Sequence, residues 1–405
     1  MTASAPVGHN RPSDFPVILP VYKRSTIRMV RGEGVYLFDE EGRQYLDFAA
    51  GIAVNSLGHC HPHLVKALQE QAATLWHTSN LYTSSAQEKL AARLVEQTCA
   101  DSVFFCSTGL EASECAIKMV RKYFDEKGEP EKYRIITLEG SFHGRSIATI
   151  SAAGKEKLTK GFAPLLDGFD QVPMGDIQAL RAKITPFTAA IMLEPILGEG
   201  GVIPCPPEYL RELRAIADAF GLLLVFDEVQ CGYGRPGALF YHQMVGVEPD
   251  IITAAKGIGS GFPLAACLAK KHVAEIMTPG SHGSTYGGNP LAMAVGNAVL
   301  DVILKPGFFE HVQARGKELY EGLEALVKKY PKLLAEARGV GLMLGLKTVI
   351  PNMDVVVALR EQGLLTVLAD DNVIRILPPL IIEKAHIAEA LDKIEVALQR
   401  LGGAA

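Results

Sequence analysis

The chain of 405 residues is 48% hydrophobic and 21% charged, which is ordinary for a globular protein large enough for two domains. Its formal net charge of −5 gives no reason to expect nucleic acid or an anionic membrane as a partner, although small anionic ligands are not excluded. The seven cysteines lack a CxxC pair, residues 1–20 lack the pattern of a secretory signal, and no apolar stretch reaches membrane-spanning length. A cytoplasmic protein with reduced thiols is therefore expected.

The N-terminal part of the chain predicts an extended arm, a hairpin and a helix. Residues 1–20 hold four prolines and few apolar anchors, which favours the arm. Segments 34–39 and 44–48 flank a turn and predict the hairpin, and residues 58–71 follow a helical pattern. Three histidines lie between residues 59 and 63, but no distant cluster offers ligand spacing, so a turn is favoured over a metal site.

A strand, a tight turn and a helix follow one another after residue 100. Residues 101–106 predict the strand, Ser107-Thr108-Gly109 forms the turn, and the helical pattern runs from Ala112. Free backbone amides and the helix dipole at such a turn can bind an anion, although an ordinary capped helix is the commoner meaning. Neither the P-loop nor the dinucleotide-binding glycine pattern is present here.

Two further strand patterns end in chemically notable loops. The strand at 134–138 leads to Phe142 and Arg145, which could stack on a flat cofactor ring and clamp a carboxylate, or could be a packed loop aromatic and a surface arginine. The strand at 189–193 is followed by Glu194 and Glu199 on a glycine-rich loop. Helix 207–220 then returns the chain for another strand, which continues an α/β alternation.

The stretch from residue 222 to residue 256 predicts a cofactor site. Two apolar strands, 222–226 and 250–255, end at Asp227 and Lys256. Ligands bind beyond the carboxyl ends of such strands, so both side chains should face one crevice. A lysine amine that condenses with an aldehyde and a carboxylate that holds the proton on a pyridine nitrogen suit pyridoxal phosphate. Either residue alone would have an ordinary structural explanation; the pair is informative.

The last third of the chain predicts a loop with a possible phosphate donor and a separate small unit. Thr285, in the loop 282–290 after a strand at 261–268, could donate to a phosphate or serve only its own turn. A composition shift near residues 305–307 marks a boundary. Arg375, in an apolar strand, either pairs with a carboxylate or faces solvent from an edge. The unit beyond the boundary is predicted to contain helix 308–329, strand 340–347, helix 352–362, strands 364–369 and 372–377, and helix 383–401.

Taken together, these segments resemble the class III aminotransferases of the fold type I pyridoxal-phosphate enzymes. The most specific likeness is the run 223–235 followed by 250–257, and the likeness to the acetylornithine aminotransferases is carried by 49–59, 76–80, 142–145 and 285–290. The resemblance implies an α/β fold with a large cofactor-binding domain built on a mostly parallel seven-stranded sheet. It assigns residues 61–305 to that domain, and residues 21–60 and 306–405 to a smaller α+β domain.

The resemblance also implies cofactor roles for individual residues. Lys256 would be the catalytic residue that binds pyridoxal 5'-phosphate covalently and moves the proton, while Asp227 would pair with the ring nitrogen. Thr285 would reach the phosphate from a neighbouring subunit, which implies a homodimer with shared active sites. The complete set of implied cofactor-binding residues is Thr108, Gly109, Phe142, Asp227, Glu228, Val229, Gln230, Lys256 and Thr285.

Four residues are assigned to substrates in the same way. Arg375 would bind the α-carboxylate of 2-oxoglutarate or glutamate, and Arg145 would bind the other carboxylate or that of acetylornithine. Ser284 would lie against the substrate. Glu199 would act as a gate that pairs with Arg375 and swings away when a dicarboxylate enters.

The implied reaction converts N-acetylornithine and 2-oxoglutarate into N-acetylglutamate 5-semialdehyde and glutamate, as in arginine biosynthesis. Gly51 replaces a tyrosine of the ornithine aminotransferases, which leaves room for an acylated amine, and the phosphate turn departs from the family's frequent Ser-Gly-Ala. Related ω-aminotransferases for succinylornithine, succinyl-diaminopimelate, ornithine or 4-aminobutyrate stay open, as does a non-catalytic binding protein of this fold. A nucleotide-dependent dehydrogenase is disfavoured because the glycine fingerprint is missing.

Overall fold

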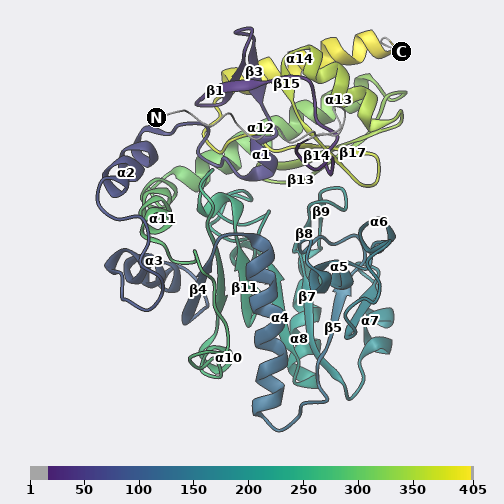
Figure 1. Ribbon diagram of the computed structural model, residues 1–405. Helices are drawn as coiled ribbons and strands as arrows, with labels where there is room; N and C mark the ends of the chain where they lie inside the picture. Colours follow the sequence, from purple (N-terminus) through teal and green to yellow (C-terminus); the bar gives the residue numbers. More distant parts are fainter. Residues whose placement is uncertain (1–16, 403–405) are drawn as a thin grey trace, which may run out of the picture.

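The computed structural model describes residues 17–402, so the arm expected over residues 1–20 lies, except for its last four residues, outside the described part of the chain. Figure 1 shows two structural units. The larger one is a sheet with helices on both faces, and the smaller one is an α+β unit that lies above it in this view. Within residues 17–402 no single helix is both long and apolar enough to cross a membrane. In this part of the chain, only the bent pair formed by helices 290–303 and 308–329 reaches that length and composition, and only when the two helices are taken together.

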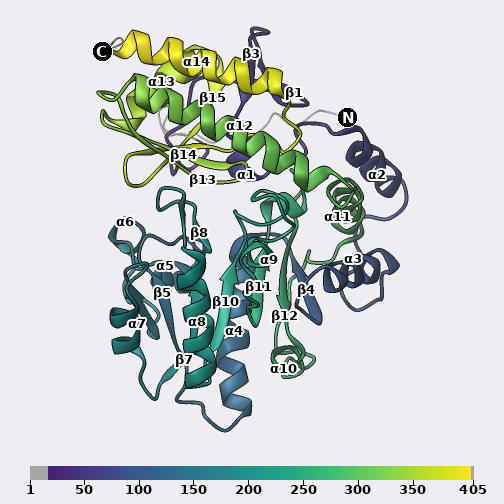
Figure 2. The same ribbon diagram turned by 180° about the vertical axis from the view of Figure 1, so that it is seen from behind.

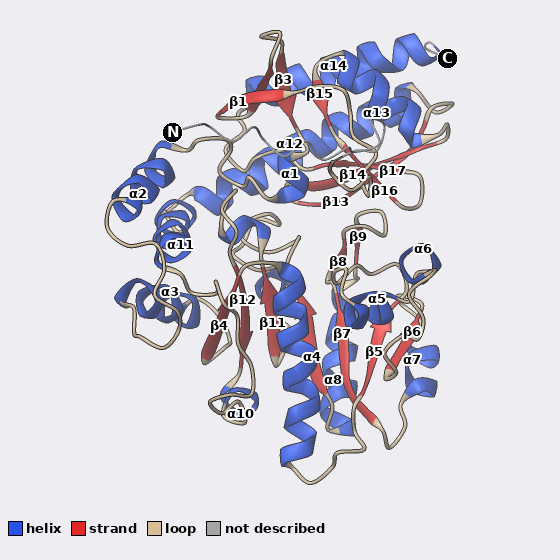
Figure 3. Ribbon diagram, in the orientation of Figure 1, coloured by secondary structure: helices blue, strands red, loops and turns tan. Residues whose placement is uncertain are grey.

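A sheet of seven strands forms the centre of the large unit (Figure 3). The strand order is β4-β12-β11-β10-β7-β5-β6, and β12 alone runs antiparallel to its neighbours. The strands are β4 (Ser102–Cys106), β5 (Arg134–Leu138), β6 (Phe169–Val172), β7 (Thr188–Leu193), β10 (Leu223–Asp227), β11 (Ile251–Ala254) and β12 (Ala265–Ala269). The predicted α/β fold class with a mostly parallel sheet is confirmed.

Buried helices cover both faces of this sheet, because its central strands are apolar on both sides. In β10, Val225 packs toward α4 (Gly109–Glu126), whereas Leu224 and Phe226 pack toward α8 (Pro207–Phe220) on the face seen in Figure 2. The other elements of this unit are α2 (Pro62–Ala72), α3 (Ser85–Glu96), α5 (Ile147–Ala153), α6 (Glu156–Thr159), α7 (Ile177–Lys183), β8 (Ile196–Leu197), β9 (Ile203–Pro204), α9 (Tyr241–Val245), the 3₁₀ turn η1 (Lys256–Ile258), α10 (Lys271–Ala274) and α11 (Pro290–Ile303).

The smaller unit joins both ends of the described chain. Leu46 of the predicted N-terminal hairpin pairs in parallel with Leu364, more than 300 residues away, and both side chains lie in one core. The N-terminal elements are β1 (Met29–Glu33), β2 (Tyr36–Asp39), β3 (Gln44–Asp47) and α1 (Ala50–Ala53). The C-terminal elements are α12 (Phe308–Lys329), β13 (Leu334–Val340), β14 (Met343–Thr348), α13 (Asn352–Glu361), β15 (Leu364–Leu365), β16 (Val367–Ala369), β17 (Val373–Ile376) and α14 (Lys384–Gly402).

The structure differs from the sequence prediction where one strand was expected over residues 340–347. Two antiparallel strands, β13 and β14, occupy this region because Gly341 (φ 57°) turns the chain between them. The sequence pattern does not predict β13 because the middle of this strand is polar, with Glu336 and Arg338. The predicted domain boundaries stay a prediction, although the chain bends by 72° between α11 and α12, close to residue 305.

Arg235 ties the two units together. Its side chain is 1% exposed and its Nη1 donates to the carbonyls of Leu342 (2.9 Å) and Pro378 (2.5 Å), both in the smaller unit. Burial lowers the pKa of this guanidinium to about 9. A buried cation with carbonyl partners from two segments fixes the smaller unit, and with it Arg375, relative to β10.

Replacing Leu46 with alanine tests whether the N-terminal hairpin belongs to the C-terminal core. Leu46 is 1% exposed, so we expect a loss of roughly 2–5 kcal/mol of unfolding free energy from lost burial and the resulting cavity. The measurement is the urea unfolding midpoint, with Val30→Ala as the control because Val30 is 61% exposed on β1. Equal midpoints for the two variants would contradict the shared core.

Candidate active site

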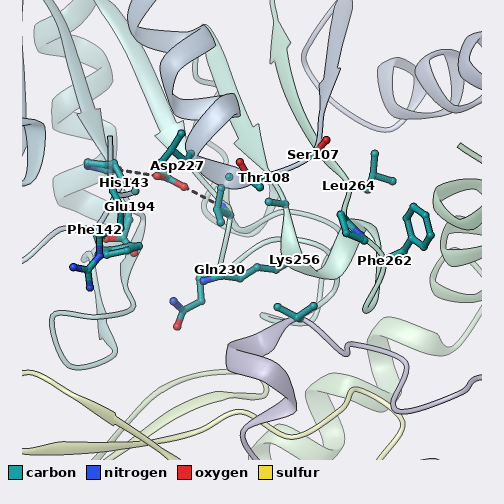
Figure 4. Close-up of a pocket in the computed structure, with 18 of the residues that line it drawn as sticks. Ser107, Thr108, Phe142, His143, Glu194, Asp227, Gln230, Lys256, Phe262 and Leu264 are labelled. Atoms are coloured by element: carbon teal, nitrogen blue, oxygen red, sulfur yellow. Dashed lines mark hydrogen bonds and ion pairs between the residues drawn. The ribbon is translucent and has the colours of Figure 1, made fainter. Parts of the chain in front are cut away.

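A cavity of about 420 Å³ opens at the carboxyl ends of β10 and β11 (Figure 4). Asp227 ends β10 opposite Thr253 of β11, and Lys256 follows β11 by two residues, so parallel pairing brings the acid and the amine to one edge of the sheet. The residues that line the cavity include Val54, Ser107, Thr108, Gly109, Leu110, Phe142, His143, Arg145, Glu194, Asp227, Val229, Gln230, Lys256, Phe262 and Leu264.

Asp227 is held by two donors. The carboxylate is 3% exposed; its Oδ1 accepts from the amide of Val229 (3.1 Å) and its Oδ2 lies 2.7 Å from Nδ1 of His143. Burial of His143 lowers the pKa of the imidazole, but the hydrogen bond to Asp227 and the charge of that carboxylate outweigh burial and raise the pKa above its ordinary value. The shift favours the protonated form of the imidazole, which lies against the carboxylate of Asp227.

Glu194 is a buried residue of the cavity that the predicted site did not include. It is 4% exposed and accepts from the amides of Phe142 (2.7 Å) and Gly198 (3.0 Å). Burial, followed by the charge of Asp227, raises the pKa of Glu194 to about 7. Figure 4 shows Phe142, His143 and Glu194 together on one side of Asp227. Glu194 thus fixes the loop that carries the aromatic ring and the histidine.

Lys256 occupies a strained and poorly solvated position. Its backbone has φ 52°, in the left-handed region that costs a non-glycine residue of order 1–3 kcal/mol and that occurs preferentially at functional sites. Burial of the amine, and next the positive charge of Arg375, lowers the pKa of Lys256 to about 8. A minority of this amine is therefore neutral near physiological pH, far more than at its ordinary pKa, and the neutral form is the one that a nucleophile requires.

The predicted phosphate turn begins α4, with Thr108 as its N-cap. Glu111 closes a capping box and accepts from the amides of Ser107 (3.0 Å) and Thr108 (2.9 Å) and from the hydroxyl of Ser284 (2.9 Å). Gly109 packs so closely that an added Cβ would lie 2.9 Å from a methyl group of Val229, so a larger residue would require the Val229 side chain to shift. The helix N-terminus therefore faces the cavity through Gly109 and the residue after it.

Arg375 pairs with Glu199 beside the cavity. The guanidinium is 1% exposed, and its Nη1 lies 2.8 Å from Glu199 Oε1 and 3.2 Å from Gln230 Oε1. Its Nη2 donates to the carbonyl of Leu368 (2.9 Å), and its Nε has no partner among residues 17–402. The predicted pairing of the arginine with a carboxylate is thus present, and one donor is left for a ligand.

Three other predicted site residues, Glu228, Ser284 and Thr285, are not part of the cavity lining, whereas Arg145 is. The Glu228 carboxylate points to the start of α9, where it accepts from the amides of Tyr241 and His242. Thr285 is exposed, and Ser284 binds Glu111. Arg145 is exposed and lies 5.4 Å from the centre of the Phe142 ring, at the cavity wall. The ligand roles of these residues stay predictions.

The fold and this set of side chains define a transferase site for pyridoxal phosphate. Asp227 suits a protonated ring nitrogen, Phe142 and Val229 suit the two faces of a flat ring, and the start of α4 suits a phosphate. Lys256 lies within the same cavity with a depressed pKa. The Nε2 atom of His143 is buried and has no hydrogen-bond partner within residues 17–402. This ring nitrogen is therefore left for a further hydrogen bond.

The chain belongs to the class III aminotransferase family: residues 20–398 match the family model Aminotransferase class-III. It is 58% identical over 380 residues to the acetylornithine aminotransferase of Brucella melitensis, covering 94% of each chain. The N-acetylornithine aminotransferase of Stenotrophomonas maltophilia aligns with TM-score 0.82 and 38% identity over 94% of this chain and 97% of that one. The ornithine aminotransferase of Toxoplasma gondii, with partial occupancy of PLP at its active site, aligns with TM-score 0.90 and 32% identity over 94% and 92%.

These matches confirm the predicted family, the aminotransferase activity and the cofactor. Class III aminotransferases depend on pyridoxal phosphate, and their substrates are small molecules. The individual cofactor contacts within this chain stay predictions.

The depressed pKa of Lys256 predicts how the cofactor attaches. Because only the neutral amine reacts, covalent attachment of pyridoxal phosphate to the apoprotein should rise with pH through about 8, not 10.5. The measurement is the rate of the absorbance change at each pH, with mass spectrometry after borohydride reduction to locate the modified lysine. Arg375→Gln should move the midpoint upward because a like charge is removed. An unshifted midpoint near 10.5 would contradict the assignment.

Proposed function

We propose that this chain transfers the terminal amino group of N-acetylornithine to 2-oxoglutarate, giving N-acetylglutamate 5-semialdehyde and glutamate, a reaction used in arginine biosynthesis. The observation that carries the proposal is the buried Arg375 paired with Glu199 beside the cofactor cavity. The 58% identity to an acetylornithine aminotransferase over 94% of both chains supports the choice of amino donor.

Pyridoxal phosphate, when bound, supplies an electron sink that stabilises negative charge at the carbon bearing the amino group. Lys256 holds the cofactor and then, with its amine lowered in pKa, removes and returns the proton at that carbon. Asp227, supported by His143, keeps the proton on the ring nitrogen. Phe142 covers one face of the ring and excludes water from it.

The remaining proposed contacts are supported by the presence of their residues in the cavity lining. Gln230 binds the ring hydroxyl, and Val229 packs against the ring face opposite Phe142. Thr108 and Gly109 bind the phosphate at the start of α4, where the helix dipole favours an anion. Glu228 supports this arrangement from behind β10 by holding α9.

The gate accounts for two substrates of different charge at one site. N-acetylornithine carries a single carboxylate, which binds Arg145 at the cavity wall while its terminal amine reaches Lys256. Arg375 is then neutralised by Glu199, so no unpaired buried cation remains. 2-Oxoglutarate brings a second carboxylate, which replaces Glu199 on Arg375 in a bidentate contact that includes the free Nε atom.

We also propose a cytoplasmic homodimer with shared active sites. Exposed apolar side chains gather on two loops near Thr285, with Leu81 at 87%, Trp76 at 65% and Tyr286 at 65% exposure. The loops touch each other, because Asn80 donates to the carbonyl of Gly287 (2.8 Å). Such apolar surface suits burial against a second copy of the chain, which would place Thr285 at the partner's phosphate. The cytoplasm suits the unpaired cysteines of residues 17–402.

A substrate panel tests the proposed function. With 2-oxoglutarate as the acceptor, kcat/KM should be highest for N-acetylornithine, ahead of succinylornithine, ornithine and 4-aminobutyrate. Ornithine should be poor because its free α-amine finds no polar partner at Gly51. The measurement is glutamate formation with each donor, and a preference for ornithine or 4-aminobutyrate would refute the proposal.

Mixing two inactive variants tests the shared active site. Lys256→Ala removes the catalytic amine, and Thr285→Glu should repel the phosphate of the cofactor bound in the neighbouring subunit. If sites are shared, a mixed dimer contains one site with both native residues, so reassociating the two variants should restore transamination. Absence of recovery in dimers that have demonstrably exchanged subunits would show that Thr285 serves its own subunit.

A further inference from the structure

The backbone of the gate residue is held by the tip of the hairpin formed by β16 and β17. Glu199 lies in the loop between β8 and β9, which points toward the smaller unit (Figure 1). The amide of Asp370, at the hairpin tip, donates to the carbonyl of Glu199 (2.9 Å). The same hairpin carries Arg375 in β17, so both members of the gate are attached to one element.

Two lysines hold the hairpin tip from the large unit. The Asp370 carboxylate binds Lys155 through one oxygen (3.1 Å) and Lys157 through the other. Both lysines lie at the start of α6, on the segment that follows Phe142 along the chain. The tip is therefore clamped between α6 and the loop that carries Glu199. We refer to Asp370, Lys155 and Lys157 as the clasp.

A second contact fixes the other end of the gate loop. Arg338 of β13 donates through Nε to the carbonyl of Gly201 (2.8 Å) and through Nη2 to Asp371 (2.9 Å). A Cβ at Gly201, which has φ 114°, would lie 2.6 Å from the same guanidinium. The loop is thus pinned at the carbonyl of Glu199 and again at Gly201, and the Glu199 side chain, 29% exposed, is left as the part that can move.

The clasp is more than an ordinary surface ion pair. The side chains of Lys155 and Asp370 are 13% and 37% exposed, so water screens the pair incompletely. Burial raises the pKa of Asp370, but hydrogen bonds from Lys157 and Lys155 outweigh it and hold the pKa below its ordinary value. Asp371 and Asn372, with φ 58° and 55°, form a tight turn that leaves the tip little freedom.

We propose that Asp370, held by Lys155 and Lys157, is a positioning residue that keeps Glu199 on Arg375 and so sets the balance between the two amino donors of the enzyme. The inference rests on the proposed function, in which the closed gate serves N-acetylornithine and the open gate serves the dicarboxylate. Arg375 is fixed by its own strand, whereas the carbonyl of Glu199 is held by the amide of Asp370, the residue that the clasp anchors. Loosening the clasp therefore penalises the closed gate more than the open one.

The test compares two donors on the same holoenzyme. Single-turnover conversion of the bound cofactor to its amine form is followed by absorbance with N-acetylornithine and, separately, with glutamate. The quantity compared is the rate constant with N-acetylornithine divided by the rate constant with glutamate. Asp370→Asn should lower this ratio roughly fivefold, as expected for the loss of a partly screened ion pair. Damage to the cofactor site would slow both donors alike and cancels in this ratio.

Matched variants separate positioning from folding. Lys157→Met, at a side chain 59% exposed, should lower the ratio in the same direction without endangering the fold, and Asp370→Glu should retain most of the native ratio. The control is Glu395→Gln on α14, which breaks a comparable pair with Lys329 on α12, remote from the gate, and should leave the ratio unchanged. An unchanged ratio in both Asp370→Asn and Lys157→Met, or equal losses with both donors, would overturn the proposal.

A second readout does not depend on the substrate assignment. Hydrogen exchange of residues 198–202 in the holoenzyme should accelerate in Asp370→Asn and not in Glu395→Gln, because the amides of this loop lose their clamp. If the native enzyme failed to use N-acetylornithine, the proposed function would fall while faster exchange would still support the clasp. Unchanged exchange together with an unchanged ratio would refute the proposed role of the clasp and leave the proposed function standing.

Discussion

The buried carboxylate of Asp227 is the interaction on which the site depends. A charge at 3% exposure is stable only when donors surround it, and here the Val229 amide and the His143 imidazole supply them. This requirement fixes more than one side chain. It requires that β5 and β10 end at the same edge, and that the loop carrying His143 be anchored by Glu194. The sheet topology is therefore the means by which a buried acid and its two donors are brought together beside a cavity.

Two groups of oppositely charged side chains lie at this edge of the sheet. In one group, His143 faces Asp227, and Glu194 has its pKa raised to about 7 by burial and by the neighbouring acid. In the other group, Arg375 faces Glu199. Lys256 lies between the two groups and is influenced by both. The amine is consequently tuned by residues that come from strands far apart in the sequence, not by its immediate neighbours along the chain.

The sequence predicted those parts of the site that depend on local pattern. Apolar runs ending in Asp227 and Lys256 were sufficient, because parallel strands must deliver their last residues to one edge. Contacts that depend on packing could not be foreseen. His143 reaches Asp227 across 84 residues, and Ser284 reaches Glu111 across 173. Alternation along β10 turns Glu228 away from the cavity, a consequence of strand geometry that a motif match does not express.

The gate has a consequence for proton transfer as well as for substrate charge. Burial is the largest cause of the lowered pKa of Lys256, Arg375 is the next, and Glu199 acts in the opposite direction. If Glu199 simply left, the field of Arg375 on the amine would increase. A dicarboxylate that takes the place of Glu199 brings its own negative charge to Arg375, so one carboxylate is exchanged for another. The proposed mechanism therefore implies that Lys256 experiences a similar field in both half-reactions, as a single amine that moves the proton in each direction would require.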